Sequence, residues 1–368
     1  MEALYPLRFR EILRNYGFGK RWIVEAFEKE GLPEDHRIAE TWEVVDRPGE
    51  SSVVVNGPLT GETLHGLIER YGARLLGSDI VRRCGTRFPL LIKFLDASNP
   101  LGEQVHQDDA LAARLGLTDP GKTEAWYMLK ARAGATIHCG PVDGATESAL
   151  HDALLAGTVR DLMQEQAVRP GDAFLLHAGT MHYSHGGVLF YEIMQNSDVI
   201  IGLRKPDESL PPAEREVRVQ AMMAGVHLEE GFDCRIPPVV LRVGANTRSI
   251  AMACPYFALE RLELSEPYAM RCDGTRFFVL SQIEGGATVI AGGQRLALRP
   301  GHSCLLPASL GEVVLEPEGP CALLKAYVPD LLRDIVTPLR EAGVADEAIA
   351  ALGGRTRLNA LRELVGWA

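Results

Sequence analysis

The chain has 368 residues, of which 46% are hydrophobic and 24% charged, so we expect a soluble globular protein with two domains and an appendage rather than one core. Its formal net charge of −11 argues against nucleic acid or an anionic membrane as the main partner. Because no apolar run resembles a signal peptide or a membrane span, and the seven cysteines have no regular spacing, we expect free thiols and a cytoplasmic location.

The first elements combine strand and helix patterns. Residues 38–55 are rich in β-branched side chains and predict strands around a turn at residues 47–49. Residues 60–76 place apolar side chains at helical spacing and predict a helix. Residues 88–95 form a continuous apolar strand that carries one lysine, Lys93. Strands around Val105 and residues 126–129 follow.

A strand–turn–strand pattern then occurs twice. Residues 134–140 resemble residues 286–292, and each copy continues with Arg-Pro-Gly and then Leu-Leu at the same offset. Such a repeat predicts two related β-domains, each with its own core. The first copy continues to a histidine, His182, whereas the second copy has Glu312 at the matching position.

Helical patterns surround these repeats. Residues 143–166 form a helical insertion in the first copy, where the second copy has only a short turn. The proline-containing residues 205–240 predict a crossover between domains. The tail, residues 329–368, has apolar side chains at helical spacing and could cap a sheet edge or form a homodimer contact.

Four potential metal ligands lie in three strand-like segments. Gln104 and His106 are two residues apart, so they point to the same face of a strand. A barrel can bring Glu124 and His182 to the same interior. Two imidazoles, a carboxylate and an amide oxygen suit zinc, with iron, manganese or cobalt as alternatives. An ordinary structural role for any single histidine remains the alternative reading.

The segment around His182 strengthens the metal hypothesis. Gly171-x5-His177-x-Gly179-x2-His182 fits the second metal motif of cupin barrels, except that His177 replaces a proline. Glycines at such turns permit the backbone conformations that aim a strand inward.

Several strings in the same order resemble class I mannose-6-phosphate isomerases of the short bacterial type, within the cupin superfamily. They cover residues 38–200 well and 250–328 weakly, and they are Glu40-Thr-Trp-Glu43, Phe88-Pro-Leu-Leu-Ile-Lys93, Gln104-Val-His-Gln-Asp-Asp109, Gly121-Lys-Thr-Glu-Ala-Trp-Tyr127, Ala178-Gly-Thr-Met-His182 and Gln195-Asn-Ser-Asp198.

The resemblance implies a mainly β fold with two cupin-like, jelly-roll β-barrel domains, helical insertions and a helical C-terminal tail. We expect a metal-binding catalytic domain at residues 1–203, a metal-free cupin-like domain at 204–328 and the tail at 329–368. It also implies a zinc site at Gln104, His106, Glu124 and His182, and interconversion of mannose 6-phosphate and fructose 6-phosphate.

The chain departs from that family pattern around the substrate. Gly102 stands where a serine usually helps to hold phosphate, and Gly202 stands where an arginine usually supports turnover. Arg204 could replace that arginine, and Lys205 could hold an anionic group. The resemblance also implies substrate-binding Lys93 and catalytic Lys122. As a base, Lys122 would need its pKa lowered from about 10.4 towards neutrality; an anchor for phosphate or hydroxyl is the alternative.

Two other functions remain open on the sequence. One is a different metal-dependent cupin enzyme, an oxygenase or an epimerase acting on a non-phosphorylated sugar, which the loss of the serine at Gly102 mildly favours. The other is a sugar-binding cupin that has kept the metal but lost catalysis.

Overall fold

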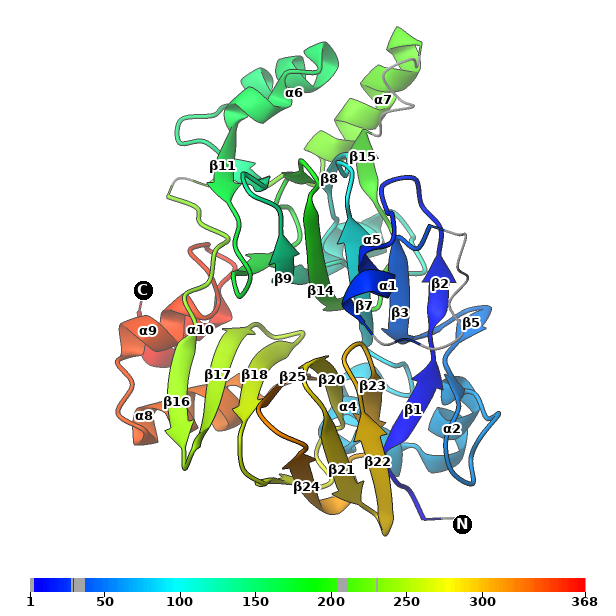
Figure 1. Cartoon of the computed structure of the whole chain (residues 1–368). Helices are drawn as coiled ribbons and strands as arrows, with labels where there is room; N and C mark the ends of the chain where they lie inside the picture. The colour runs from blue at the N-terminus through cyan, green and yellow to red at the C-terminus, as the bar shows by residue number, and fades with distance from the viewer. Residues whose placement is uncertain (1–2, 28, 30–36, 204–210, 230, 368) are drawn as a thin grey trace.

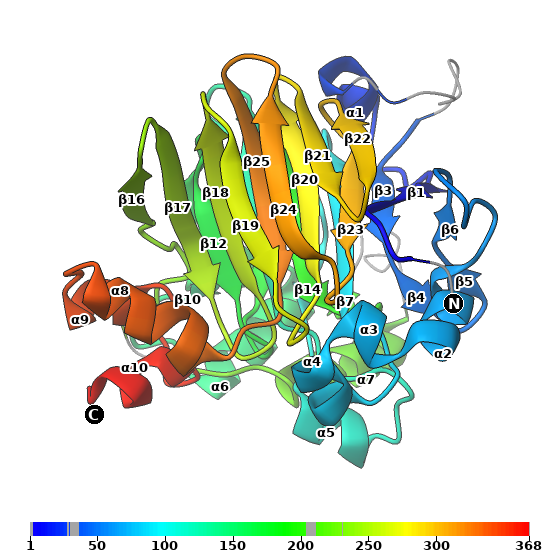
Figure 2. The same ribbon diagram turned by 90° about the horizontal axis from the view of Figure 1, so that it is seen from below.

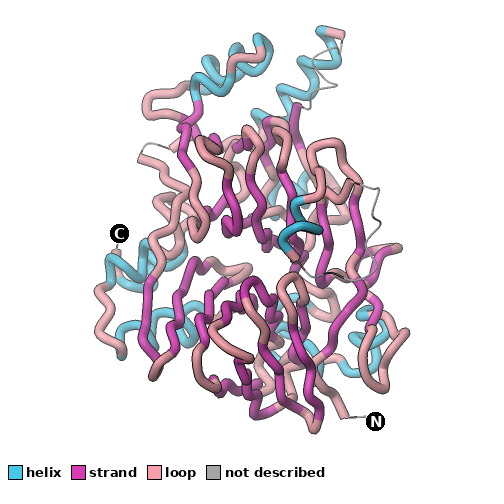
Figure 3. The backbone as a smooth tube through the Cα atoms, viewed as in Figure 1, coloured by secondary structure: helices cyan, strands magenta, loops and turns pink. Residues whose placement is uncertain are grey.

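The computed structural model describes residues 3–27, 29, 37–203, 211–229 and 231–367. Antiparallel strands dominate it, so the chain is mainly β, as predicted (Figure 3). Its sheets form two units that lie against each other, with helices at their periphery (Figures 1 and 2).

The first unit contains a six-stranded sheet with the order β12-β9-β14-β7-β3-β2 and a five-stranded sheet with the order β11-β10-β13-β8-β15. Their bounds are β2 Ile12–Arg14, β3 Glu40–Val44, β7 Leu90–Ala97, β8 Glu103–Val105, β9 Glu124–Ala131, β10 Thr136–Pro141, β11 Met163–Ala167, β12 Ala173–Leu176, β13 His182–Ser184, β14 Val188–Gln195 and β15 Ile201–Leu203.

The second unit contains an eight-stranded sheet with the order β16-β17-β18-β25-β20-β23-β1-β6 and a four-stranded sheet with the order β19-β24-β21-β22. Their bounds are β1 Leu7–Arg10, β6 Val53–Val54, β16 Val239–Val243, β17 Asn246–Ala253, β18 Ala258–Leu264, β19 Tyr268–Cys272, β20 Phe278–Glu284, β21 Ala287–Ala291, β22 Gln294–Leu298, β23 Ser303–Leu306, β24 Gly311–Pro317 and β25 Cys321–Tyr327.

The strand orders confirm the internal repeat. The run β12-β9-β14-β7 corresponds to β23-β20-β25-β18, and β11-β10-β13-β8 corresponds to β22-β21-β24-β19. The glycines of the two Arg-Pro-Gly turns, Gly171 and Gly301, adopt φ values of 90° and 87°. Only glycine adopts such angles without strain, so both turns keep the same residue for the same reason.

Strand β1 ties the beginning of the chain to the second unit. It pairs with β23 on one side and with β6 on the other, so β1 and β6 extend the second unit's sheet. The largest hydrophobic cluster also spans the units, since it includes Phe94 and Tyr191 from the first and Phe277 and Leu324 from the second. The two units therefore share a core. The strands β4 Asp46–Arg47 and β5 Glu50–Ser51 form a separate hairpin.

The predicted helix at residues 60–76 is divided at Gly72, where φ is 47°. Thr63 caps its first part by accepting a hydrogen bond from the Gly66 amide. The helices of this region are α1 Trp22–Ala26, α2 Leu64–Tyr71, α3 Ala73–Leu76, α4 Ser78–Cys84 and α5 Asp109–Arg114.

The insertion at 143–166 is helical, as predicted, and consists of α6 Glu147–Ala156 and η1 Val159–Leu162, followed by β11. It packs against α7 Pro212–Met223, a helix inside the segment expected to be only a crossover. Both helices stand at the end of the first unit that faces away from the second (Figure 1). The tail folds into η3 Leu332–Val336, α8 Thr337–Glu341, α9 Asp346–Ala351 and α10 Ala360–Val365.

The expectation that all cysteines are free thiols is wrong for one pair. Cys139 of β10 and Cys234 form a disulfide across 95 residues of sequence. The other five cysteines are free, and all lie within the described residues. The spacing of the cysteines does not predict this pair, because Cys139 and Cys234 are distant in sequence and only the fold brings them together. Within the described residues, no helix has both the length and the apolar character needed to cross a membrane.

Candidate metal centre and active site

Three of the expected ligands converge in the first unit. Glu124 begins β9, His182 begins β13 and His106 directly follows β8. The Nε2 atoms of His106 and His182 lie 3.3 and 3.2 Å from the two carboxylate oxygens of Glu124. One ligand atom from each residue lies within 4.8 Å of the others. A single cation between them could therefore contact all three.

Five polar atoms of this cluster are buried without a hydrogen-bond partner among the described residues, although the Lys122 ammonium forms an ion pair with one of them, Oε2 of Glu124, at 3.0 Å. These atoms are both nitrogens of His106, both carboxylate oxygens of Glu124 and Nε2 of His182. Burying such groups without partners costs free energy, so their concentration at one point requires an explanation. A divalent cation held by Nε2 of each histidine and by the carboxylate of Glu124 would satisfy these atoms together, and the donor set suits one.

The backbone fixes the ring of His182 in the form that a metal ligand needs. Its Nδ1 lies 2.9 Å from the carbonyl oxygen of Thr180. A carbonyl only accepts, so Nδ1 must carry the proton and donate it. The lone pair is then on Nε2, the nitrogen that faces Glu124.

The electrostatics of the cluster also favour the protonation states that a metal ligand needs. Burial, assisted by the charge of Lys122, lowers the pKa of His106 to about 3. Burial would raise the pKa of Glu124, but the ammonium of Lys122 and the neighbouring imidazoles hold that pKa well below its usual value. At neutral pH the cluster therefore offers a neutral imidazole and a carboxylate, as metal binding requires.

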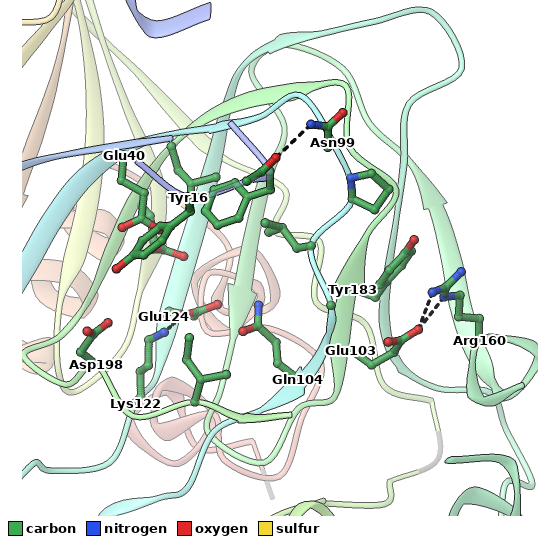
Figure 4. A pocket seen from close by; sticks show the side chains of 18 of the residues that line it. Tyr16, Glu40, Asn99, Glu103, Gln104, Lys122, Glu124, Arg160, Tyr183 and Asp198 are labelled. Carbon is green, nitrogen blue, oxygen red and sulfur yellow. Dashed lines mark hydrogen bonds and ion pairs between the residues drawn. The ribbon is translucent and has the colours of Figure 1, made fainter. Parts of the chain in front are cut away.

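Gln104 lies beside the three clustered residues. It is the cross-strand partner of His182 and points into the pocket near Glu124 (Figure 4). Its role as a fourth ligand remains a prediction, supported by this position.

The cluster opens onto a cavity of about 670 Å³. This volume falls in the range of small-molecule sites. The cavity is lined at one end by Glu124, Lys122 and Asp198, and at the other by Glu103, Arg160 and Tyr183 (Figure 4).

Lys122, predicted to be catalytic, lies in the cavity wall. Its Nζ is 3.0 Å from Oε2 of Glu124, and its side chain is only 4% exposed. The lysine therefore adjoins the metal cluster and faces the space that a substrate would fill.

Lys93, predicted to bind substrate, also lines the cavity, but two carboxylates already surround its ammonium. Nζ lies 2.6 Å from Glu192 and 3.3 Å from Glu40. Each carboxylate also accepts a hydrogen bond from a buried indole, Trp126 to Glu192 and Trp42 to Glu40. The ammonium is thus held in a buried network rather than free to meet an anion.

Sequence reasoning did not assign these two glutamates to the site. Glu40 lies two residues before Trp42, so both side chains point to the same face of the strand. This spacing was the one feature of the sequence that could have placed Glu40 in the site. Glu192 had no local signal, because its importance comes from pairing across β14 with Lys93 of β7.

The predicted catalytic Arg204 and substrate-binding Lys205 lie outside the described residues. Two other arginines line the cavity. Arg160 of η1 forms an ion pair with Glu103 at 2.6 Å. Arg215 of α7 donates to the Leu154 carbonyl at 3.1 Å, while its buried Nε has no hydrogen-bond partner among the described residues.

The second unit lacks the ligands at the matching positions. Leu306 pairs with Phe278 as Leu176 pairs with Glu124, so phenylalanine occupies the glutamate's place. The pair Glu312 and Arg271 corresponds to His182 and Gln104, and these two side chains form an exposed ion pair at 3.1 Å. The chemistry suggested by the first unit is therefore absent from these positions of the second.

Two family profiles match the chain. The phosphomannose isomerase type I catalytic domain matches residues 7–126, and the mannose-6-phosphate isomerase cupin domain matches residues 247–327. The first match contains three of the four expected ligands. The second lies in the unit that lacks them.

Individual proteins give the same result. The mannose-6-phosphate isomerase ManA of Bacillus subtilis is 31% identical over 293 residues, 77% of this chain and 88% of that protein. A mannose-6-phosphate isomerase of Streptococcus mutans is 28% identical over 74% of this chain and 83% of its own length. The crystal structure of a Bacillus subtilis mannose 6-phosphate isomerase superposes with a TM-score of 0.74 at 23% identity, covering 88% of this chain and 99% of the other.

Proposed function

Because the chain belongs to the type I mannose-6-phosphate isomerase family, we infer that it interconverts mannose 6-phosphate and fructose 6-phosphate. The observation that carries this inference is the buried His106–Glu124–His182 cluster at the wall of a cavity. The reaction moves a proton between C1 and C2 of the sugar, and negative charge develops on the neighbouring oxygens. A cation beside those oxygens is what such a reaction needs.

We propose that His106, Glu124, His182 and Gln104 hold zinc. Nitrogen and oxygen donors in this number suit zinc, and the same set would accept iron, manganese or cobalt. When bound, the cation supplies Lewis-acid stabilisation of the charge that develops on the sugar oxygens. The protein contributes the burial of the ligands and the hydrogen bond that fixes the His182 ring.

Lys122 is the described cation nearest to the cluster, and we propose that it handles the transferred proton or the adjacent hydroxyl. Its ion pair with Glu124 fixes the ammonium at the edge of the cavity. Arg204, as a replacement for the family arginine missing at Gly202, completes the proposed catalytic pair.

The phosphate group of the substrate needs cations at a distance from the metal cluster. Lys93 and Lys205 were the residues expected to bind substrate, but the two carboxylates around Lys93 already balance its charge. We propose that Arg215 receives the phosphate, because it lines the cavity and forms no ion pair within the described residues, whereas Glu103 already balances the charge of Arg160. Guanidinium groups match phosphate geometry well.

The decisive experiment is an NMR assay of the purified, zinc-loaded protein with mannose 6-phosphate in deuterated water. Formation of fructose 6-phosphate, with solvent deuterium entering at C1 or C2, is the expected result. Metal analysis of the same sample should find zinc, and removing it with a chelator should stop turnover. Oxygen consumption without isomerisation would instead assign an oxygenase, and thermal stabilisation by the sugar without turnover would assign a binding protein.

The finer architecture is also proposed. The matching sheets support two cupin-like jelly-roll barrels. A catalytic domain at 1–203, a metal-free domain at 204–328 and the tail at 329–368 remain the proposed division, although β1 and β6 from the first range pair into the second unit's sheet. A homodimer remains a proposal. So does a cytoplasmic location, which the five free cysteines support and the Cys139–Cys234 disulfide opposes.

A further inference from the structure

A second group of potential metal ligands lies on three adjoining backbone segments of the five-stranded sheet. His138 belongs to β10, Glu165 to β11, and His185 directly follows β13. His138 is the cross-strand partner of Glu165 on one side and of Tyr183 on the other. One ligand atom from each of the two histidines and the glutamate lies within 4.8 Å of the others.

This group is separate from the first cluster because it lies on the other face of the sheet. Neighbouring residues of a strand point to opposite faces. Cys139 pairs with His182 of the first cluster, whereas His138 pairs with Tyr183. The sheet therefore presents the first cluster on one face and His138, Glu165 and His185 on the other.

His138 provides a second observation that points to a ligand. His138 is only 7% exposed, and its Nδ1 is buried without a hydrogen-bond partner among the described residues. An imidazole nitrogen buried in this way has lost its water without gaining a protein partner. Glu165 and His185 are exposed, so a cation could reach the group from solvent.

We propose that His138, Glu165 and His185 form a second divalent-cation site. Two imidazoles and a carboxylate are a donor set typical of zinc, with water completing the coordination on the exposed side. The nearby cation Arg160 does not oppose binding strongly, because Glu103 forms an ion pair with it at 2.6 Å.

Occupation of this site would join three backbone segments, including the end of β13. That strand carries His182 at its other end, so the second cation would stabilise the strand that positions a ligand of the first. A ligand that binds only the folded state raises its stability in proportion to the logarithm of ligand concentration. Added zinc should therefore raise the melting temperature even after the first site is full.

The test measures zinc stoichiometry and the melting temperature together. Protein carrying one tightly bound zinc would be equilibrated with a micromolar concentration of free zinc, and bound metal would be counted by mass spectrometry. We expect a second equivalent in the wild type, with a rise in melting temperature. His185→Ala and Glu165→Gln should each lose the second equivalent and this rise, but keep the first zinc and isomerase activity.

Two further variants separate the sites. His65→Ala removes an exposed histidine that lies beside Asp46 and Glu69, and it should leave both equivalents in place. His182→Ala should lose the first zinc and keep the second. A wild type that binds only one zinc, or a His185→Ala protein that still binds two, would overturn the second site without affecting the proposed isomerase function.

Discussion

Gln104 lies directly opposite His182 on the neighbouring strands β8 and β13. This pairing places an amide beside the histidine whose ring is fixed by the Thr180 carbonyl. Glu124 reaches the same point from β9 in the other sheet of the unit. The proposed metal centre therefore joins the two sheets, and its ligands depend on strand pairing rather than on a single loop.

Replacing either member of this pair should weaken zinc binding. We expect His182→Ala to abolish turnover in zinc-supplemented buffer, because it removes a buried ligand. Gln104→Ala should reduce zinc affinity by at least about tenfold, which competition with a chromophoric chelator would measure. Gln220→Ala, which alters an exposed glutamine on α7, is the matched control. Full activity in His182→Ala protein would refute the central role of the metal.

The buried network around Lys93 predicts that replacing this lysine lowers the stability of the folded protein. Lys93→Met leaves Glu40 and Glu192 facing each other without their shared cation, and breaking a buried ion pair in this way costs about 3–5 kcal/mol. Urea denaturation would measure this loss. Glu192→Gln should cost less, because Lys93 keeps Glu40 and the amide oxygen can still accept from Trp126. A Lys93→Met protein with normal stability and only a raised KM would instead identify Lys93 as a direct substrate ligand.

The sequence predicted the repeat and most strands because both depend on local patterns. The β-branched residues at 38–55 and the two Arg-Pro-Gly turns are visible without a structure. Helix α7 was missed because its prolines resembled a linker, although Pro212 occupies the first turn, where proline is tolerated. The pairing of β1 with β23 was also invisible, since it joins residues about three hundred positions apart in sequence.

In the candidate site, too, some residues could be predicted from local sequence and others depend on pairing between distant strands. His106, Glu124 and His182 could be proposed because they are ligand-type residues in strand-like segments, because His182 completes a cupin-like motif, and because the family resemblance implies the same set. The surroundings of Lys93 could not be foreseen, because its partners come from β3 and β14 and meet it only through sheet pairing. The same limit applies to Arg215, which reaches the cavity from α7.

A charged cluster in the second unit predicts a specific acid sensitivity. Glu260 is fully buried and contacts both Arg248 and Lys325 through the same carboxylate, with Oε2 at 2.7 and 2.8 Å respectively. Burial opposes its ionisation, but these two cations outweigh that effect and lower the pKa of Glu260 to about 2.

A folded-state pKa below the unfolded value stabilises the protein above the unfolded pKa, and this contribution is lost as the pH falls through the folded value. The contribution of Glu260 at neutral pH is on the order of 3 kcal/mol. Glu260→Gln should therefore be markedly less stable than the wild type at pH 7, and the difference should shrink between about pH 5 and pH 2. Denaturation at several pH values would measure it, with exposed Glu347→Gln as the control. A pH-independent difference would contradict this ionic explanation.

The proposed phosphate contact makes Arg215 a test of substrate recognition. Its buried Nε has no partner among the described residues, and its Nη2 donates to the Leu154 carbonyl, so the guanidinium is held in place at the cavity. Arg215→Gln should raise KM for mannose 6-phosphate by about tenfold or more, because a hydrogen bond to a charged group contributes about 1.5–3 kcal/mol. The effect on kcat should be small, since the phosphate lies away from the reacting carbons. Arg215→Lys keeps the charge and should recover part of the affinity, and the melting temperatures of both variants would show whether the contact between α6 and α7 survives. If Arg215→Gln is folded and keeps the wild-type KM, the phosphate binds elsewhere in the cavity.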